Sequence, residues 1–192
     1  MTFGYCQATR FLIGFKRTGE KSESPSSLVR KALNLFSSFV WQVGSMNPVV
    51  VYSTKSGNTE KVALEIAHEL NCKAIKISGE SDFSTISLKD FDAVFIGTWV
   101  RGGEPSPIML SFLKQLNLED SNRQFALFMT WAGGGVSDVW TFKRVKQLLE
   151  VKNQKLLDDY YKCLGKTFGL ARRGHPNVQD LADARKWARK VC

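Results

Sequence analysis

From residue 46 onward, hydrophobic and polar positions form alternating blocks that predict strands and helices in turn. Pro48 to Ser53 is a short valine-rich run that suits a strand buried on both faces. It is followed by Thr59 to Leu70, in which apolar residues recur at the spacing of an amphipathic helix. Together these segments predict a first β-α unit.

The same alternation continues to the end of the chain. Four more strands are predicted over Cys72–Ile77, Phe91–Gly97, Phe125–Trp131 and, from a weaker pattern, Leu156–Leu164. Three more helices are predicted over Pro107–Leu116, from Asp138 to about Val151 with Ser137 as N-cap, and from Asn177 or Gln179 to Val191. Five strands separated by helices predict an α/β fold, a three-layer sandwich whose parallel sheet carries helices on both faces.

Ligands of such sheets bind beyond the carboxyl ends of the strands. The predicted loops after the first, third and fourth strands lie there, and all three have an unusual composition. A ligand-binding site is therefore expected in these loops.

Residues 1–45 have a different character. The turn-like SESPSS is followed by SLVRKALNLFSSFVW, which would form one amphipathic helix. The segment is interpreted as a basic targeting peptide, as a docking helix, or as an extension upstream of a true start at Met46. We favour the last, because a complete domain pattern begins at Met46. The expected division is a poorly ordered or artefactual extension over 1–45 and one α/β domain over 46–192.

The net charge of +9 alone would suggest a nucleic acid or an anionic surface as partner. Residues 1–45 hold six basic and two acidic residues, and residues 46–192 hold 21 basic and 16 acidic. In the second part the basic residues are mostly scattered, and no aromatic interleaving or nucleic-acid motif accompanies them. We interpret them as solvated helix faces and expect no nucleic-acid partner.

Charged residues interrupt every apolar run before it reaches the roughly 18 to 20 residues that span a bilayer. We therefore expect no integral membrane segment. The four cysteines are far apart, without the spacing of a metal site or a redox motif. This spacing favours a location in the reducing cytoplasm and predicts no metal site.

The loop Ser53–Thr59, STKSGNT, separates the first strand from the first helix. Small residues here let backbone N–H and side-chain O–H groups converge at the positive end of the helix dipole, which favours a phosphate. Gly57 permits a close approach of the backbone or a positive φ. A hydrophilic turn with a helix cap is the alternative, but five of the seven residues are small and polar. The loop lacks GxxxxGK[ST] and GxGxxG, which disfavours a nucleoside triphosphate.

The stretch TKSGNT resembles the phosphate loop of the flavodoxins, commonly T-x-[TS]-G-N-T, and the resemblance covers residues 48–192. It implies a flavodoxin-like sandwich with strand order 2-1-3-4-5 and FMN as cofactor. In that family the loop holds the FMN phosphate without a metal or an arginine. The resemblance implies that the residues of this loop bind the FMN phosphate: Thr54, Lys55, Ser56, Gly57, Asn58 and Thr59.

The loop Gly97–Pro107 carries Trp99 where flavodoxins place an aromatic residue over one flavin face. An aromatic ring packs well on oxidised flavin. Ordinary packing in the core or at its rim is the alternative, and the phosphate loop leads us to favour stacking. The resemblance makes Thr98, Trp99, Val100, Arg101 and Gly102 the expected contacts, with Arg101 near the pyrimidine edge.

The segment Met129–Trp140 departs from the flavodoxins, because many of them have an acidic, tyrosine-bearing segment here, whereas this chain has three glycines and no tyrosine. The second flavin face is then covered by Trp131, by backbone, or left open. The expected edge contacts are Thr130, Trp131, Ala132, Gly133, Gly134 and Gly135.

No catalytic residue is expected. His68 falls on the polar side of the first helix and His175 near the start of the last, and neither accompanies a nucleophile or a carboxylate pair. Asp158 and Asp159 are adjacent in an expected strand, so they would point to opposite faces.

The leading hypothesis is an FMN-binding, flavodoxin-like protein that shuttles electrons between a reductase and a redox acceptor. The flavin then supplies the chemistry and the protein binds and tunes it. The alternative is an FMN-dependent oxidoreductase that binds a quinone or NAD(P)H over the flavin, and a third is a regulatory or binding module without flavin. Typical flavodoxins are acidic; this basic domain should stabilise anionic reduced flavin and make its potential less negative.

Overall fold

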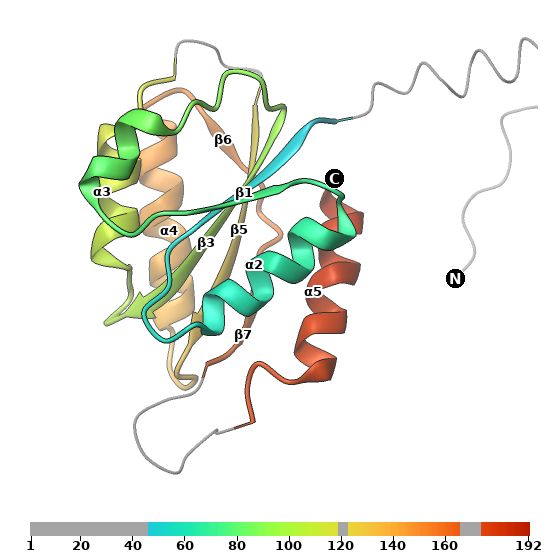
Figure 1. Cartoon of the computed structure of the whole chain (residues 1–192). Helices are drawn as coiled ribbons and strands as arrows, with labels where there is room; N and C mark the ends of the chain where they lie inside the picture. The colour runs from blue at the N-terminus through green and yellow to red at the C-terminus, as the bar shows by residue number, and fades with distance from the viewer. Residues whose placement is uncertain (1–45, 119–122, 166–173) are drawn as a thin grey trace, which may run out of the picture. The chain divides into compact units, whose positions relative to one another are not determined.

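A single sheet lies between two layers of helices in the computed structural model, which describes residues 46–118, 123–165 and 174–192 (Figure 1). The strands are β1 (Pro48–Tyr52), β2 (Lys73–Lys76), β3 (Ala93–Arg101), β4 (Glu104–Pro105), β5 (Gln124–Trp131), β6 (Lys155–Leu156) and β7 (Tyr161–Leu164). The helices are α2 (Asn58–Glu69), α3 (Pro107–Gln115), α4 (Ser137–Glu150) and α5 (Val178–Val191), with a short 3₁₀ helix η1 (Glu80–Thr85).

The sheet confirms the predicted order. Its path is β2-β1-β3-β5-β6, these pairs are all parallel, and β7 also pairs with β5 in parallel. The predicted fifth strand is therefore present as two pieces that follow β5 one after the other. Counted as one, they give the order 2-1-3-4-5.

The break between β6 and β7 corrects the expected continuous strand over Leu156–Leu164. Asp158 and Asp159 lie in this break rather than in a strand. Asp158 accepts a bond from Lys146 of α4 at 2.7 Å, and Asp159 from Lys190 of α5 at 2.6 Å. The two carboxylates thus bind helices of opposite layers and form no acid-base pair.

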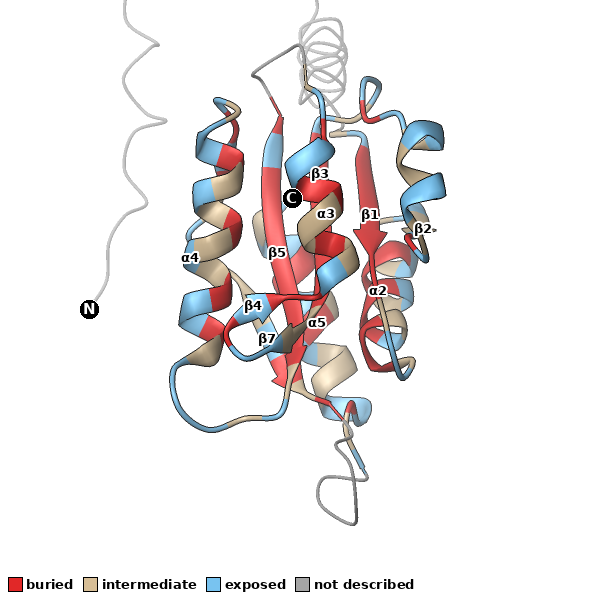
Figure 2. Cartoon of the chain, turned by 90° about the vertical axis from the view of Figure 1, so that its left-hand side faces the viewer, coloured by how far each residue is buried: buried red, intermediate tan, exposed pale blue. Residues whose placement is uncertain are grey.

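Two hydrophobic clusters follow from strand alternation, because successive side chains point to opposite faces of the sheet. The cluster under α3 and α4 includes Val49, Val51, Val94, Ile96, Phe125, Leu127, Met129, Met109, Phe112, Leu113, Val145 and Leu149. The cluster under α2 and α5 includes Val50, Tyr52, Phe95, Phe128, Val62, Ile66, Ala184 and Trp187. Figure 2 shows the central strands as buried ribbons between these layers. The Val, Leu, Ile, Phe and Met side chains in these clusters each contribute roughly 1.5–3 kcal/mol when fully buried.

Helices α2 and α5 lie side by side and are joined by ion pairs. Arg185 pairs with Glu65, and Arg189 Nη1 lies 2.5 Å from Glu69 Oε1. At the start of α5, Asn177 caps the helix, since its side chain accepts a bond from the Asp180 backbone N–H at 2.9 Å. None of the helices in the described ranges has the length and apolar character needed to traverse a bilayer.

Candidate functional site

The loop between β1 and α2 is a tight turn that begins the helix. Gly57 is the N-cap of α2 and has φ +80°, a left-handed conformation that a glycine adopts without strain. Its N–H donates to Thr54 Oγ1 at 3.0 Å, and the Asn58 side-chain amide donates to Ser56 Oγ at 3.1 Å. Thr54 and Ser56 accept in these bonds, so each hydroxyl proton remains available to an anion.

The space in front of this turn is open. A Cβ built at Gly57 would meet no heavy atom within 4 Å. The glycine is therefore required by its backbone angle and not by a neighbour. Lys55 and Ser56 are exposed at the tip of the turn, and Thr54 is half-buried.

A carboxylate in the first turn of α2 is directed away from this loop. Glu60 accepts from the Tyr52 hydroxyl at 3.0 Å and from Lys76 Nζ at 3.2 Å. The bonds from Lys76 and Tyr52 lower the pKa of Glu60, while burial and Glu60 raise the pKa of Tyr52 to about 12. Lys76 offsets the negative charge that would otherwise repel an anion at the helix start.

Beneath the loop, three fully buried hydroxyl residues join the two neighbouring strands to α3. Ser53, at the end of β1, shares a short hydrogen bond with Ser106, and the Ser106 N–H donates to Thr98 Oγ1 at 2.9 Å. Ser106 is also the N-cap of α3, because its side chain accepts from the Met109 N–H at 3.3 Å. Sequence reasoning missed Ser106, although a serine directly before a proline-initiated helix is an N-cap signal.

A second buried pair joins the first loop to the third. Thr59 Oγ1 and Thr130 Oγ1 lie 2.8 Å apart, and both residues are buried. One hydroxyl donates to the other, so only one proton of the pair remains for another acceptor. Thr59, Thr98 and Thr130 thus connect strands and helices from inside, whereas Thr54 and Ser56 lie nearer the surface.

Trp99 lies within β3 and not in a loop, which corrects the expectation that this strand ends at Gly97. A Cβ at Gly97 would come within 2.2 Å of the Phe128 ring and 2.7 Å of Tyr52 Cβ. Gly97 is therefore a mid-strand glycine that makes room for its neighbours. Trp99 pairs with Thr130 in the sheet and is half-buried, with Lys55 Nζ 5.9 Å from its ring centroid.

Beyond Trp99, β3 turns back on itself. Val100 pairs with Pro105 and Arg101 with Glu104 in antiparallel register. The turn consists of Gly102 and Gly103, with φ +59° and +86°, the angles that two-residue hairpins favour. Arg101 and Gly102 are exposed, whereas Val100 packs on the core under α3 and α4.

The third loop contains a run of three glycines in the left-handed backbone conformation. Gly133, Gly134 and Gly135 all have positive φ, between +67° and +89°. Ala132 and the last two glycines are exposed. The N-cap of α4 is Val136, without a side-chain cap, so the predicted Ser137 cap is wrong and Ser137 is the first helical residue. The positive-φ run ends at Gly135, so the helix begins one residue earlier than predicted, directly after Val136.

Trp131, at the end of β5, has a cation on its ring. Lys162 Nζ of β7 lies 5.0 Å from the ring centroid and also pairs with the buried carboxylate of Asp138 in α4. The Tyr160 hydroxyl donates to the same carboxylate at 3.0 Å. Burial alone would raise the pKa of Asp138, but the bonds from Lys162 and Tyr160 outweigh it and lower the pKa. This cluster, which sequence reasoning missed, holds α4 and Trp131 to β7.

Gly165, just after β7, closes the arrangement. Its N–H donates to the Trp131 carbonyl at 2.9 Å. A Cβ there would lie 3.0 Å from the Asn58 side-chain nitrogen and 3.5 Å from Thr130 Cβ. The first and third loops therefore meet at a glycine.

Comparison with known proteins identifies the family. Residues 49–171 match the sequence profile described as the flavodoxin domain. The chain belongs to the flavodoxin domain family.

Relatives of this flavodoxin-family chain are distant in sequence. An uncharacterized protein of Methanocaldococcus jannaschii is 26% identical over 153 residues, which cover 76% of this chain and 98% of that protein. The flavodoxin, WrbA-like protein of Agrobacterium tumefaciens superposes with a TM-score of 0.57 at 19% identity, over 76% of this chain and 94% of that one. Oxidised Flavodoxin 1 of Bacillus cereus gives 0.56 at 17% identity, over 74% and 95%.

A larger protein contains a similar fold. The rubredoxin oxygen:oxidoreductase of Desulfovibrio gigas superposes with a TM-score of 0.54 at 16% identity. The match covers 86% of this chain and 40% of that protein, so this chain spans less than half of its length. These structural likenesses support the flavodoxin-like fold.

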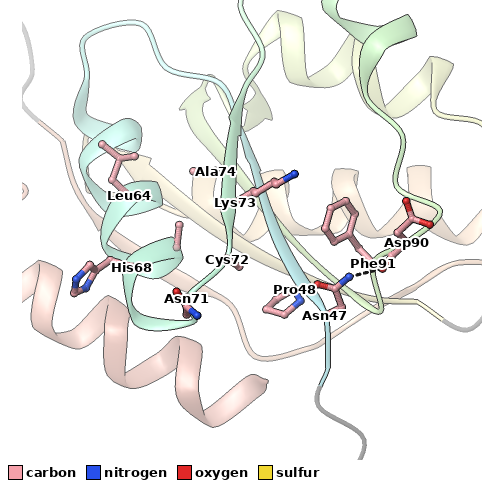
Figure 3. Close-up of a pocket in the computed structure, with 11 residues that line it drawn as sticks. Asn47, Pro48, Leu64, His68, Asn71, Cys72, Lys73, Ala74, Asp90 and Phe91 are labelled. Carbon is pink, nitrogen blue, oxygen red and sulfur yellow. Dashed lines mark hydrogen bonds between the residues drawn. The ribbon is translucent and has the colours of Figure 1, made fainter.

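The flavodoxin-family domain also has a broad open pocket at the opposite, amino edge of the sheet (Figure 3). It is lined from the start of β1, the end of α2 and the start of β2, and its volume is about 940 Å³. Its polar side chains include His68, Asn71 and Lys73, and Asn47 donates to the Asp90 carbonyl at 2.6 Å. No residue of the predicted flavin site lines this pocket.

The two histidines keep the positions that the sequence suggested. His68 is exposed on α2, and His175 Nδ1 lies 2.6 Å from Asp180 Oδ2 at the start of α5. Asp180 also accepts from the Asn177 N–H, so His175 belongs to a helix-capping arrangement.

Proposed function

We propose that this flavodoxin-family domain binds FMN at the carboxyl edge of its sheet and carries electrons between a reductase and a redox acceptor. The observation that carries the proposal is that bonds connect three segments at that edge: the loop after β1, the end of β3, and the end of β5 with the loop that follows it. The Thr59–Thr130 bond joins the first and third, and the pairing of Trp99 with Thr130 joins the second and third.

The first loop has the donors that a phosphate requires. Its backbone N–H groups lie at the positive end of α2, and the hydroxyls of Thr54 and Ser56 retain protons to donate. The open space at Gly57 would admit an anion against the backbone. Lys55, exposed at the tip, would add positive charge.

Trp99 is the residue that would support the flavin ring. It is half-buried at the carboxyl end of β3, which leaves part of its ring accessible beside the first loop. The flavin, when bound, supplies the electron-transfer chemistry. The role of the protein is to orient it, to limit its contact with water and to set the surrounding charge.

The third loop favours a second candidate function, an FMN-dependent oxidoreductase. Ala132, Gly134 and Gly135 are exposed and carry no large side chain, so they would leave the flavin edge accessible to a small substrate.

Absorption spectroscopy tests both candidates. The purified full chain, incubated with FMN and desalted, should keep a visible flavin spectrum. Under anaerobic conditions NAD(P)H alone should not bleach it, whereas NAD(P)H with a flavodoxin reductase should. A colourless protein would refute FMN binding, and steady-state oxidation of NAD(P)H without a second protein would favour the oxidoreductase.

A further inference from the structure

The start of α4 presents apolar side chains to solvent. Val136, Val139 and Trp140 are 52%, 36% and 57% exposed. Val139 and Trp140 follow the N-cap Val136 by three and four residues, which places all three on one side of the helix start, and we call them the α4 patch. Single exposed apolar residues are ordinary on protein surfaces, whereas a contiguous group is typical of an interaction site.

The α4 patch borders the proposed flavin site on two sides. Val136 directly follows the three glycines of the third loop. Trp140 lies over the β3–β4 turn, because a Cβ at Gly103 would come within 2.7 Å of Trp140 Cε3. The lower end of Figure 2, where the arrowheads of β1 and β5 point, shows α4 beginning beside β4. A protein seated on the patch would therefore contact two of the three loops.

Three exposed cations lie on the same helix as the patch or on the other two segments of this edge. Lys143 continues the helical face of the patch, and Lys55 and Arg101 are exposed on the first and second segments. No carboxylate within the described ranges forms an ion pair with these three cations.

The nearby carboxylates already have partners. Asp138 is bound by Lys162 and Tyr160, and Glu104 lies 3.4 Å from Arg144 Nε. The positive charge of Lys55, Arg101 and Lys143 is therefore not offset locally, and it would attract an acidic surface.

We propose that the α4 patch, with Lys55, Arg101 and Lys143 around it, docks a redox partner protein whose contact surface is acidic with an apolar centre. The inference rests on the proposed function, because it places electron exchange at this edge. An apolar centre supplies affinity, and surrounding charges steer the encounter and select the partner. Two copies of this basic edge would repel each other, which argues against a symmetric contact.

Direct binding tests the docking surface without depending on electron transfer. The probe is a dye-labelled plant-type ferredoxin, a small acidic redox protein, titrated with the full chain and followed by fluorescence anisotropy. Binding should weaken as salt is added. Trp140→Gln and Lys143→Glu should each weaken it about fivefold or more.

The matched controls are Leu64→Gln and Lys73→Glu. Both residues are exposed and line the pocket at the amino edge, far from the patch in the fold. These variants remove an apolar side chain and reverse a charge in the same way, and they should leave binding unchanged. Circular dichroism confirms that each variant is folded.

Several outcomes would overturn the proposal: no binding of ferredoxin, equal losses in patch and control variants, or self-association that the patch variants abolish. Tighter binding to anionic phospholipid vesicles, lost in the same variants, would assign the surface to a membrane instead. FMN absorbance of the same samples tests the cofactor separately. Ferredoxin binding without FMN retention would refute the proposed function alone, and FMN retention without ferredoxin binding would refute the docking surface alone.

Discussion

The two edges of the sheet differ in what they offer a ligand. The amino edge has the broad pocket, which is lined from α2 and the starts of β1 and β2, and more than half of its lining residues are exposed. The carboxyl edge has positive-φ glycines, buried hydroxyl pairs and a half-buried tryptophan joined across three segments. We place the proposed flavin site at the carboxyl edge because its polar groups converge and hold one another in position, although the larger pocket lies at the amino edge.

The largest expected effect is a loss of flavin affinity when Trp99 is replaced. Trp99→Ala should weaken the binding of both FMN and riboflavin at least about tenfold, because stacking on an aromatic ring is worth roughly 1–3 kcal/mol. Trp140→Ala, which removes a ring of the same kind farther from the first loop, should change neither affinity. Flavin fluorescence quenching on titration measures both. Equal losses of affinity in the two variants would contradict the proposal that Trp99 stacks on the flavin.

Positive φ occurs at both ends of α2 and allows a matched test. Gly57→Ala and Asn71→Ala should each cost roughly 1 kcal/mol of unfolding free energy, since φ is +80° and +48° at these positions. Only Gly57→Ala should weaken FMN binding, by about tenfold, because it displaces the donors of one charged hydrogen bond. Riboflavin, which has no phosphate, should bind both variants alike.

Denaturant unfolding and flavin titration of the same samples give the two quantities. A loss of FMN affinity in Asn71→Ala as large as in Gly57→Ala would contradict the claim that the phosphate binds beside Gly57 at the carboxyl edge.

Ion pairs offer a third contrast, in stability. Asp138→Asn should lower the free energy of unfolding by about 1–3 kcal/mol, because it leaves a buried side chain without its charged bond to Lys162. Glu69→Gln breaks the pair with the exposed Arg189 and should cost less than about 1 kcal/mol.

The pH dependence of the first variant follows from the lowered pKa of Asp138. A lowered folded-state pKa contributes stability above the unfolded value of about 3.9, and that stability is lost as the pH falls through the folded pKa. The difference between the wild-type protein and Asp138→Asn should therefore narrow below about pH 4. Urea unfolding at neutral and acidic pH measures it, and a constant difference would exclude the ionised carboxylate as the cause.

The smallest effect concerns exposed charge. Lys55→Glu should weaken FMN binding a few-fold at low salt and less at high salt, because exposed charges are screened. Lys73→Glu makes the same charge change at the amino edge and should have no effect. Titrations at two ionic strengths distinguish a local role of Lys55 from a general effect of net charge.

Local sequence features predicted much of the fold. The alternation of apolar runs and amphipathic repeats predicted a parallel sheet with helices on both faces, and the resemblance to the flavodoxins supplied the strand order. A glycine at position 57 permitted the positive φ that the turn has. Positions that depend on distant neighbours were not predicted. Gly97 remains in the strand because Phe128 and Tyr52 occupy its side-chain space, and the Thr59–Thr130 bond joins residues 71 positions apart.

Other differences had a local signal that was read differently. Gly102-Gly103 is a two-residue hairpin signal, but the whole of Gly97–Pro107 was interpreted as one loop that contacts the flavin. Lys162 had no signal, since a lysine in a short strand is ordinary until Asp138 and Trp131 are placed beside it.

The central claim is that the first loop recognises the phosphate of FMN, and paired titrations of the wild-type chain test it most directly. FMN and riboflavin share the isoalloxazine and differ in the phosphate, so the ratio of their dissociation constants isolates the contribution of the loop. We predict that FMN binds at least about tenfold more tightly, because one or more hydrogen bonds to a charged group are each worth roughly 1.5–3 kcal/mol. Equal affinity for the two flavins, or binding of neither, would contradict the account.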